Sequence, residues 1–223
     1  MATYIAKEIK CATAYKGDSA LTNYASINKK CCVGRIDSSS NVYRSFFDYD
    51  LSGLPTDVEI NSASLYVYTS SASLANSSTS STRLPNVYKC ENTWSEDSVS
   101  LGNQPSISQE SYGHLNTVSV GWKQIDITDL VKELITDNYG ICLKLPSELS
   151  NSTCCEFANR YGDDTTLASY IEINYVGNQL YKISESRVRE IADEVRRLTN
   201  TTEPLTINEM IAVLRTLPSQ TVE

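Results

Sequence analysis

Side chains that could do acid–base or nucleophilic chemistry are scarce in this chain. Its single histidine, His114, lies in the turn-like stretch SYGH, and no serine lies within a G-x-S-x-G sequence. A hydrolase needs a nucleophile with an adjacent base, or two paired carboxylates, and none of the 27 Asp and Glu residues lies in a recognised catalytic context. The nucleotide-binding patterns G-x-x-x-x-G-K-[ST] and G-x-G-x-x-G are also absent. We therefore expect a protein that is not an enzyme, with His114 in a surface loop.

Aromatic and acidic residues of two loops are better candidates for binding. Tyr112 and the nearby His114, together with Tyr161 in the stretch NRYGDD, are expected to contact a ligand. Asp163 and Asp164 of the same stretch carry oxygen atoms of the kind that Ca²⁺ prefers, although fewer than six ligands are evident. The alternative for this stretch is a turn with solvated acids. No other cofactor is expected.

The seven cysteines are expected to be reduced thiols, buried or half-buried. Their odd number and the absence of an apolar signal segment argue against a disulfide framework. Cys31 and Cys32 are adjacent, as are Cys154 and Cys155, and neighbours on a strand point to opposite faces. Neither pair therefore matches the C-x-x-C spacing of a zinc site.

Charge and hydropathy argue against two classes of partner. The net charge is −8 and no cluster of Lys and Arg exists, which disfavours a nucleic acid. No window approaches the roughly 18 apolar residues of a membrane span, and the start MATYIAKEIK lacks the apolar segment of a signal peptide. We expect synthesis in the cytosol without a signal peptide, and no membrane partner.

The candidate residues depend on β-strands to position them. In residues 43–51 the odd positions fall on one side of an extended chain, and Arg44, Asp48 and Asp50 fall on the other, with Phe46 as the exception. This alternation predicts a half-buried strand in which Arg44 forms a structural ion pair with Asp48 or Asp50. The sequence SGLP ends the strand, as turn residues do.

The alternation continues through most of the chain. After the turn, Leu65 and Val67 lie on one side of the next strand, and Tyr66 and Tyr68 lie on the other. Nine strand segments are expected, at residues 4–13, 31–36, 42–51, 63–68, 86–90, 117–127, 139–145, 154–158 and 169–176. Many short strands at this spacing predict a mainly β protein with an antiparallel β-sandwich. The polar run at 70–82 is expected to be a flexible surface loop.

One short internal helix is expected within the β region. The sequence DITD at 126–129 offers side chains that cap a helix, and an apolar stripe follows at Leu130, Val131, Leu134 and Ile135. This helix should cover an end of the sheet.

A different module follows residue 176, because the apolar period changes from two to 3.6. Residues 177–223 are expected to be a linker and a two-helix hairpin, with the capping box TINE opening the second helix. The apolar faces should dock or oligomerise through eight residues, namely Val188, Ile191, Val195, Leu198, Met210, Ile211, Leu214 and Leu217.

Residues 44–55, RSFFDYDLSGLP, resemble the core sequence of the DNRLRE-type domain, a β-jelly-roll family related to carbohydrate-binding modules. Further segments follow in the family's order, at 21–24 (LTNY), 92–105 (NTWSEDSVSLGNQP), 121–135 (GWKQIDITDLVKELI), 138–141 (NYGI) and 170–175 (YIEINY). The resemblance covers about residues 4–176 and implies a jelly roll over residues 1–176. Tyr49 stands where the family has Phe, and Leu101 where a second Trp is common, which weakens the case for sugar stacking at that segment.

The two tryptophans, Trp94 and Trp122, lie inside these framework segments. Aromatic faces suit the apolar side of a sugar ring, so both are candidates for stacking. Their place in the framework favours core packing instead.

Residues 191–217, IADEVRRLTNTTEPLTINEMIAVLRTL, resemble a short segment that recurs in proteins of phages and prophages of Gram-positive bacteria. This resemblance implies a virion made in the bacterial cytoplasm. The first hypothesis is a non-enzymatic virion surface protein, a capsid decoration, head fibre or tail-associated adhesion component. Its hairpin would attach to other virion proteins or to itself, and its jelly roll would face host-surface glycans. The alternative is a carbohydrate-binding module of a polysaccharide-degrading system, and a self-contained enzyme is the least favoured.

Overall fold

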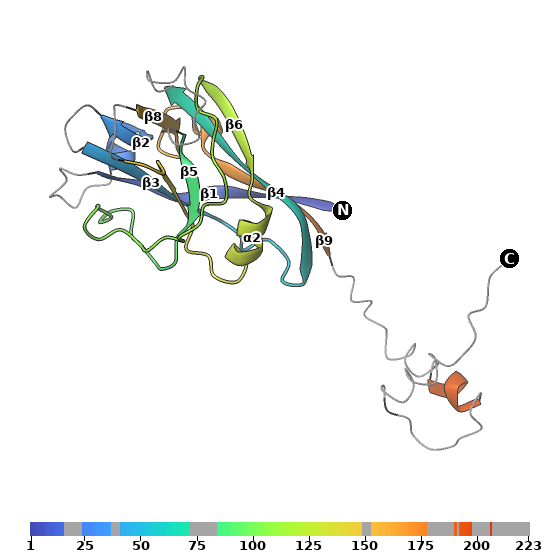
Figure 1. Ribbon diagram of the computed structural model, residues 1–223. Coiled ribbons are helices and arrows are strands. Elements are labelled where there is room, and N and C mark those ends of the chain that lie inside the picture. The colour runs from blue at the N-terminus through green and yellow to red at the C-terminus, as the bar shows by residue number, and fades with distance from the viewer. Residues whose placement is uncertain are drawn as a thin grey trace. The chain divides into compact units, whose positions relative to one another are not determined.

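The computed structural model describes residues 1–15, 24–36, 41–71, 84–148, 153–177, 190, 192–197 and 206. The chain divides into two compact units, Met1–Asn178 and Gln179–Glu223. Figure 1 shows the first unit as a body of strands. The change of apolar period in the sequence lies next to the boundary between the units.

Nine strands lie in the described part of the first unit, and all of their pairings are antiparallel. They are β1 (Ala2–Tyr15), β2 (Lys30–Ile36), β3 (Asn41–Tyr49), β4 (Val58–Ser71), β5 (Asn86–Lys89), β6 (Gly121–Asp126), β7 (Ile141–Lys144), β8 (Thr153–Ala158) and β9 (Tyr170–Gly177). Each segment predicted from the alternation overlaps one of these strands. The predicted mainly β fold with an antiparallel sandwich is confirmed.

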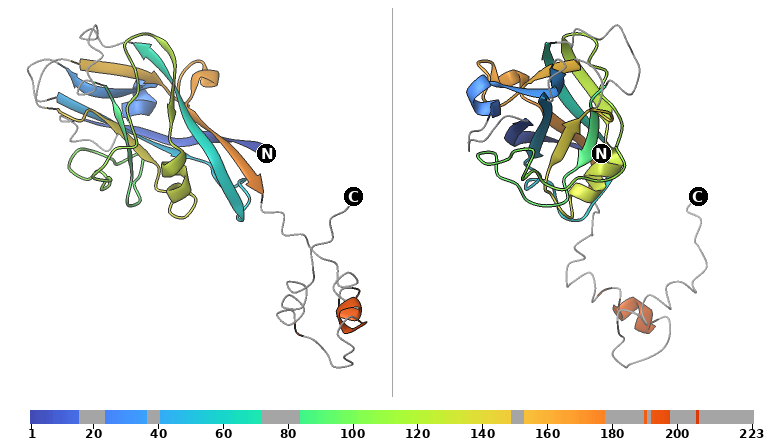
Figure 2. Two further views of the ribbon diagram at one scale, coloured as in Figure 1. Left: turned by 45° about the vertical axis from the view of Figure 1, so that its right-hand side comes forward. Right: turned by 60° about the vertical axis from the view of Figure 1, so that its left-hand side comes forward.

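Six of the strands close into a barrel-like ring. Their order is β1-β9-β4-β8-β2-β3, and β3 pairs with β1 to complete it. β7 and then β5 continue the sheet from β3, while β6 pairs with the edge of β4 opposite β9. Figure 1 shows β4 between β6 and β9, and the views of Figure 2 show the strands around a common interior. The fold is therefore a barrel-like β-sandwich.

The main core fills this interior. On β4, Ala63, Leu65 and Val67 are buried and point inward, because successive strand residues point to opposite faces. The largest fully buried members of this core are Tyr49, Phe47, Phe157, Leu65, Leu115, Ile127, Leu130, Leu134, Ile141, Leu143 and Ile171. Burying one such side chain stabilises the fold by about 1.5–3 kcal/mol.

A second core covers the opposite face of β3. The segment at 91–107 lies over it, and Trp94 Nε1 donates a hydrogen bond of 2.9 Å to the Tyr139 carbonyl oxygen. Phe46 is fully buried there, with its ring centroid 5.8 Å from that of Trp94. The prediction of a half-buried β3 is therefore wrong, because both faces of this strand are covered. The second core consists of Ala12, Ala14, Phe46, Tyr88, Cys90, Trp94, Val99 and Cys142.

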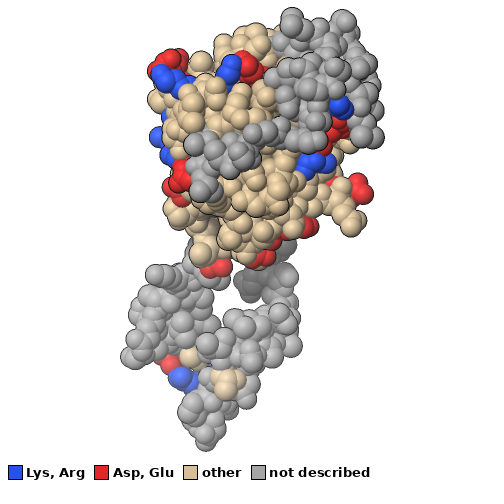
Figure 3. Space-filling model, turned by 90° about the vertical axis from the view of Figure 1, so that its left-hand side faces the viewer, with Lys and Arg blue, Asp and Glu red and all other residues tan. Residues whose placement is uncertain are grey.

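The predicted ion pair along β3 is also wrong. Arg44 forms two hydrogen bonds, of 2.8 and 2.6 Å, with the carboxylate of Glu148, and Asp48 pairs with Lys10 at 3.1 Å. The charged side chains of β3 thus find partners on other segments rather than along their own strand. Figure 3 shows Lys and Arg next to Asp and Glu at several places on one face of the β-sandwich.

The predicted internal helix is α2 (Thr128–Leu134). The Asp126 carboxylate accepts hydrogen bonds from the Thr128 backbone N–H at 2.8 Å and hydroxyl at 2.7 Å. Leu130, Val131 and Leu134 are buried as predicted, whereas Ile135, just past the helix, is 42% exposed.

Two shorter helical elements were not predicted, the helix α1 (Tyr24–Asn28) and the 3₁₀ turn η2 (Thr165–Leu167). They are too short to show an apolar period in the sequence. Of the polar run at 70–82, Ser70 and Ser71 belong to β4, and the rest lies outside the described residues.

The cysteines lie where the sequence analysis expected them. Six are buried, and Cys154 is half-buried. Cys31 and Cys155 belong to the main core, so their neighbours Cys32 and Cys154 point to the opposite face.

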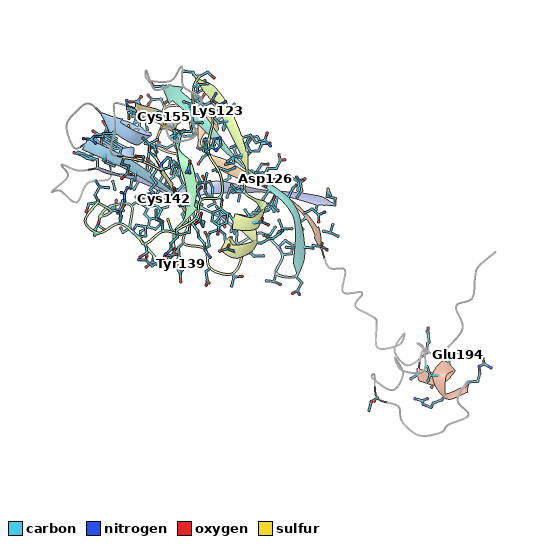
Figure 4. The ribbon with its side chains drawn as sticks, viewed as in Figure 1. Lys123, Asp126, Tyr139, Cys142, Cys155 and Glu194 are labelled. Atoms are coloured by element: carbon cyan, nitrogen blue, oxygen red, sulfur yellow. The ribbon has the colours of Figure 1, made fainter. Side chains whose placement is uncertain are left out.

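The second unit is described at residues 190, 192–197 and 206, and residues 192–197 are helical. Ala192 and Val195 are buried, whereas Glu194, labelled in Figure 4, pairs with Arg197. Val195 is thus the one predicted docking residue that the structure describes. The other seven lie outside the described residues. In the described ranges of both units, no helix is long and apolar enough to span a membrane.

Candidate functional site

Four aromatic rings gather on the outer face of β6, β4 and β9. Tyr66 and Tyr68 point outward from β4, because they alternate with the buried Leu65 and Val67. The strand register sets Trp122 of β6 opposite Tyr68, and Tyr170 of β9 opposite Tyr66. We call these four residues, Tyr66, Tyr68, Trp122 and Tyr170, the aromatic platform.

The rings of the platform support one another. Tyr66 and Tyr170 stack in near-parallel planes, 11° apart, with centroids separated by 4.8 Å. Trp122 meets Tyr68 edge-on at 5.6 Å and Tyr170 at 5.5 Å. Contacts of this kind are each worth about 0.5–1.5 kcal/mol, so they limit the freedom of the rings. Trp122 nevertheless stays 41% exposed and presents indole surface to a ligand.

A row of hydroxyl and amide groups continues the same face away from the rings. Gln124 Nε2 donates to Ser64 Oγ at 3.1 Å, and further along Asn174 Nδ2 donates to Ser62 Oγ at 3.3 Å. Thr3 of β1 donates its hydroxyl proton to Asn174 Oδ1 at 2.7 Å. Lys123 and Asp126, labelled in Figure 4, mark the course of β6 along this edge of the sheet. Amides and hydroxyls both donate and accept, so this row suits a ligand rich in hydroxyl groups.

A groove of about 470 Å³ borders the platform at Tyr170. Its lining includes Lys7 of β1 and the hydroxyl-bearing Thr165 and Thr166 of η2. Lys7 is exposed and forms no salt bridge within the described part of the chain. The groove therefore offers the ammonium group of Lys7 and threonine hydroxyl groups next to an aromatic ring.

Glu8 is a buried residue in the lining of the groove. Its carboxylate accepts hydrogen bonds from the Ser169 hydroxyl at 2.6 Å, the Ser169 backbone N–H at 3.2 Å and the Arg160 backbone N–H at 3.0 Å. Burial raises the pKa of this carboxyl, and the hydrogen bonds only partly oppose the effect. Glu8 thus joins β1 to the segment that leads into β9, which fixes the position of Tyr170.

Tyr112 and His114, the first ligand candidates from the sequence, lie in the loop between β5 and β6. The Tyr112 hydroxyl donates a hydrogen bond of 2.6 Å to Glu133, and burial raises its pKa to about 12. His114 is exposed and makes a β-bridge with Asn86. Neither residue belongs to the platform.

Tyr161, the third candidate, takes part in a polar network. Its hydroxyl donates to Glu96 Oε1 at 2.6 Å and accepts from Arg160 at 2.6 Å, and Arg160 also pairs with Glu96 at 2.6 Å. These contacts tie the segment that covers the second core to the end of β8. The network fixes the position of the Tyr161 side chain, and its role as a ligand contact stays a prediction.

The two candidate calcium ligands have separate partners. Asp163 pairs with Lys29, and the Asp164 carboxylate accepts from the Thr166 backbone N–H at 3.0 Å, which caps η2. Among the residues placed by the structure, no group of three or more His, Cys, Asp or Glu side chains could hold a metal ion.

The two tryptophans differ in their environments. Trp94 is 9% exposed and packs in the second core, as predicted. The prediction of core packing for Trp122 is wrong, because it points outward from β6, as Gln124 and Asp126 do. The alternation of Tyr66 and Tyr68 with apolar residues was the sequence signal for this face. Their partners across the sheet depend on the strand order, which the alternation does not contain.

Comparison with known proteins identifies a family. The model of carbohydrate-binding module family 96 matches residues 6–173. The match spans β1 to β9 and includes all four residues of the platform. No curated protein matches the sequence.

Proposed function

Because this chain belongs to carbohydrate-binding module family 96, we propose that its β-sandwich binds a carbohydrate on the aromatic platform. The observation that carries the proposal is the gathering of four aromatic rings on one outer sheet face, with Trp122 41% exposed. A carbohydrate-binding module is a non-catalytic binding domain, in agreement with the scarcity of catalytic side chains in the sequence.

The platform provides the two kinds of contact that a sugar requires. The indole of Trp122 would cover the apolar face of a sugar ring, and the row from Gln124 to Asn174 would pair with hydroxyl groups. The rings already hold one another in place, so binding orders few side chains and loses little conformational entropy.

The groove beside Tyr170 suggests the path of a longer ligand. A chain of sugars that begins on Trp122 would cross Tyr170 and enter the groove next to Lys7 and Thr165. This path crosses the strands in the order β6, β4, β9 and β1. We therefore propose that the ligand is a polysaccharide bound along its length.

The contribution of Trp122 follows from its exposed area. A tryptophan side chain offers about 150–250 Å², and the exposed 41% corresponds to about 60–100 Å². At about 25 cal/mol per Å², covering this area contributes roughly 1.5–2.5 kcal/mol, or about 10–70-fold in affinity. A sugar that covers one ring face only would approach the lower value.

Native gel electrophoresis in a panel of soluble polysaccharides tests the proposal. The panel would include β-glucans, xylan, pectin, alginate and bacterial wall polysaccharide. We expect at least one to retard the protein, Trp122→Ala to lose most of the retardation, and Tyr112→Ala to keep it. Tyr112 is the matched control, because it is an aromatic residue that the sequence analysis favoured as a ligand contact and that lies outside the platform.

Two results would contradict the proposal. Absence of retardation in every polysaccharide would argue against carbohydrate binding by this chain. Full retardation of a folded Trp122→Ala variant would place the binding site outside the platform, and its loss in Tyr112→Ala would move the site to the loop between β5 and β6.

A virion setting is a second proposal. It rests on the resemblance of residues 191–217 to phage and prophage segments, and on the one-sided burial of Ala192 and Val195 in the helix at 192–197. In this proposal the narrower DNRLRE-type resemblance describes the displayed domain, and the protein is made in the bacterial cytoplasm. Deletion of residues 178–223 should abolish oligomers or co-sedimentation with particles. A full-length protein that is strictly monomeric and never co-sediments with particles would exclude this setting.

A further inference from the structure

Two carboxylates lie on the same outer sheet face as the aromatic platform. Glu172 of β9 points outward, because its neighbours Ile171 and Ile173 are fully buried and successive strand residues point to opposite faces. The strand register sets Glu172 opposite Ser64 of β4, and it sets Asp126 of β6 opposite the same serine from the other side. Directly opposite residues have Cβ atoms about 4.5–5.5 Å apart. Both carboxylates therefore border the row of hydroxyl and amide groups.

The two carboxylates differ in their partners within the protein. Asp126 accepts hydrogen bonds from the backbone N–H and the hydroxyl of Thr128. Glu172 is half-buried, and within the described part of the chain its carboxylate accepts no hydrogen bond and forms no salt bridge. Lys7 of β1 lies opposite Tyr170 and not opposite Glu172. Glu172 is thus the carboxylate of this face that a ligand can use.

The position of Glu172 determines which sugars it can accept. Along β9 it lies between Tyr170 of the platform and Asn174 of the polar row, so a sugar seated on the rings meets it. A carboxylate accepts hydrogen bonds and donates none, and a sugar hydroxyl supplies the missing donor. A sugar acid would instead bring a second carboxylate, which has no proton to donate at neutral pH. Two negative charges would then lie together, partly removed from water and unpaired.

We propose that Glu172 is a specificity-determining residue of the platform, which selects an uncharged polysaccharide over a polymer of sugar acids. This inference rests on the proposed binding of a carbohydrate by the platform. The charged residues that point outward from β6, β4 and β9 are Asp126, Glu59 and Glu172, all of them acids. The net charge of −8 on the whole chain also repels a polyanion. Lys7, one strand further on, can donate to the oxygen atoms of an uncharged sugar.

Isothermal titration calorimetry with matched pairs of polymers tests this selectivity. Each pair shares one backbone and differs in charge: hydroxyethyl and carboxymethyl cellulose, methyl-esterified pectin and polygalacturonate, and the propylene glycol ester of alginate and alginate itself. For a backbone that binds, we expect the uncharged member to bind at least about tenfold more tightly, because like charges brought together oppose binding. Raising NaCl to about 0.5 M should narrow the difference, because salt screens the repulsion.

Glu172→Gln tests whether this residue carries the selectivity. The amide keeps the size of the side chain and removes its charge, so the uncharged polymer should bind about fivefold more weakly, because a charge-assisted hydrogen bond becomes a neutral one. The acidic polymer should bind more tightly, so that the ratio of the two affinities falls roughly tenfold. Glu59→Gln is the matched control. It removes the same charge from the same face, but Glu59 lies opposite Val176, about 13 Å along β9 from Glu172, and should leave the ratio within about twofold.

Three outcomes would overturn the inference, and they separate it from the proposed function. Tighter binding of an acidic polymer by the wild type, lost in Trp122→Ala, would refute the selectivity and leave the platform as the binding site. An unchanged ratio of affinities in Glu172→Gln would assign the selectivity to other residues, and Glu172→Ala serves the same test if the Gln variant fails to fold. Absence of binding to every polymer would refute the proposed function and this inference together.

Discussion

Phe46→Ala tests the second core, the part of the fold that the strand alternation placed wrongly. Phe46 is fully buried between β3 and the segment at 91–107, with its ring centroid 5.8 Å from Trp94. Removing a buried phenyl ring costs about 3–5 kcal/mol, because the transfer free energy is lost and a cavity remains. For a protein of this size the loss corresponds to a fall in Tm of roughly 6–20 °C.

Urea denaturation of the wild-type and variant proteins measures this cost. Ile9→Ala is a matched control on β1, because Ile9 is an apolar residue that is 48% exposed. A surface substitution of this kind is expected to change the free energy of unfolding by no more than about 0.5 kcal/mol. A second readout is the fluorescence of Trp94 in a Trp122→Phe background, which should shift to the red when Phe46 is removed and water approaches the indole.

A small effect would refute this account of the second core. If Phe46→Ala cost less than about 1 kcal/mol, close to the effect of Ile9→Ala, Phe46 would face solvent, as the strand alternation indicated. An unshifted Trp94 spectrum in the folded variant would lead to the same conclusion. A large cost together with a red shift would establish that residues 91–107 pack against β3.

Two further predictions concern the turn before β7 and the helix α2. Gly140 has φ of +79°, and a Cβ there would lie 2.2 Å from the Phe47 carbonyl oxygen. The left-handed conformation alone costs an alanine roughly 1–2 kcal/mol, so with the added clash Gly140→Ala should lower the free energy of unfolding by well over this amount. A Tm equal to that of the wild type would contradict this prediction. Hydrogen bonds from the Thr128 hydroxyl and backbone N–H lower the pKa of Asp126. The ionised Asp126 carboxylate therefore contributes at most about 1 kcal/mol to the free energy of unfolding, because the group is exposed. This contribution is present above the pKa of about 3.9 that the group has in the unfolded chain, and it is lost as the pH falls through the lower pKa of the folded protein. The difference in Tm between wild type and Asp126→Asn should shrink below about pH 4. A difference that stays constant down to pH 2 would argue against a contribution from the hydrogen bonds between Asp126 and Thr128.

The candidate site shows what the alternation of apolar and polar residues along a strand can predict. Residues 63–68 alternate strictly, so their sequence correctly places Tyr66 and Tyr68 on the face opposite Leu65 and Val67. The same reasoning, applied to residues 121–126, would have placed Trp122 outward with Gln124. Membership in the framework segment favoured core packing instead, and the structure corrects that interpretation. A framework residue can also be exposed when the edge strand that carries it has one face open to solvent.

The sequence by itself determined the class of fold, the nine strands and the helix α2. These depend on local period and on turn residues, which each segment carries within itself. Tertiary structure alone decided that β6 and β9 flank β4, and so that Trp122 and Tyr170 join Tyr66 and Tyr68. It also decided that β3 is covered on both faces. The order of the strands, and the burial of a strand face by another segment, arise from contacts between residues that are distant in the sequence. The apolar period of one segment contains no information about which segment lies beside it.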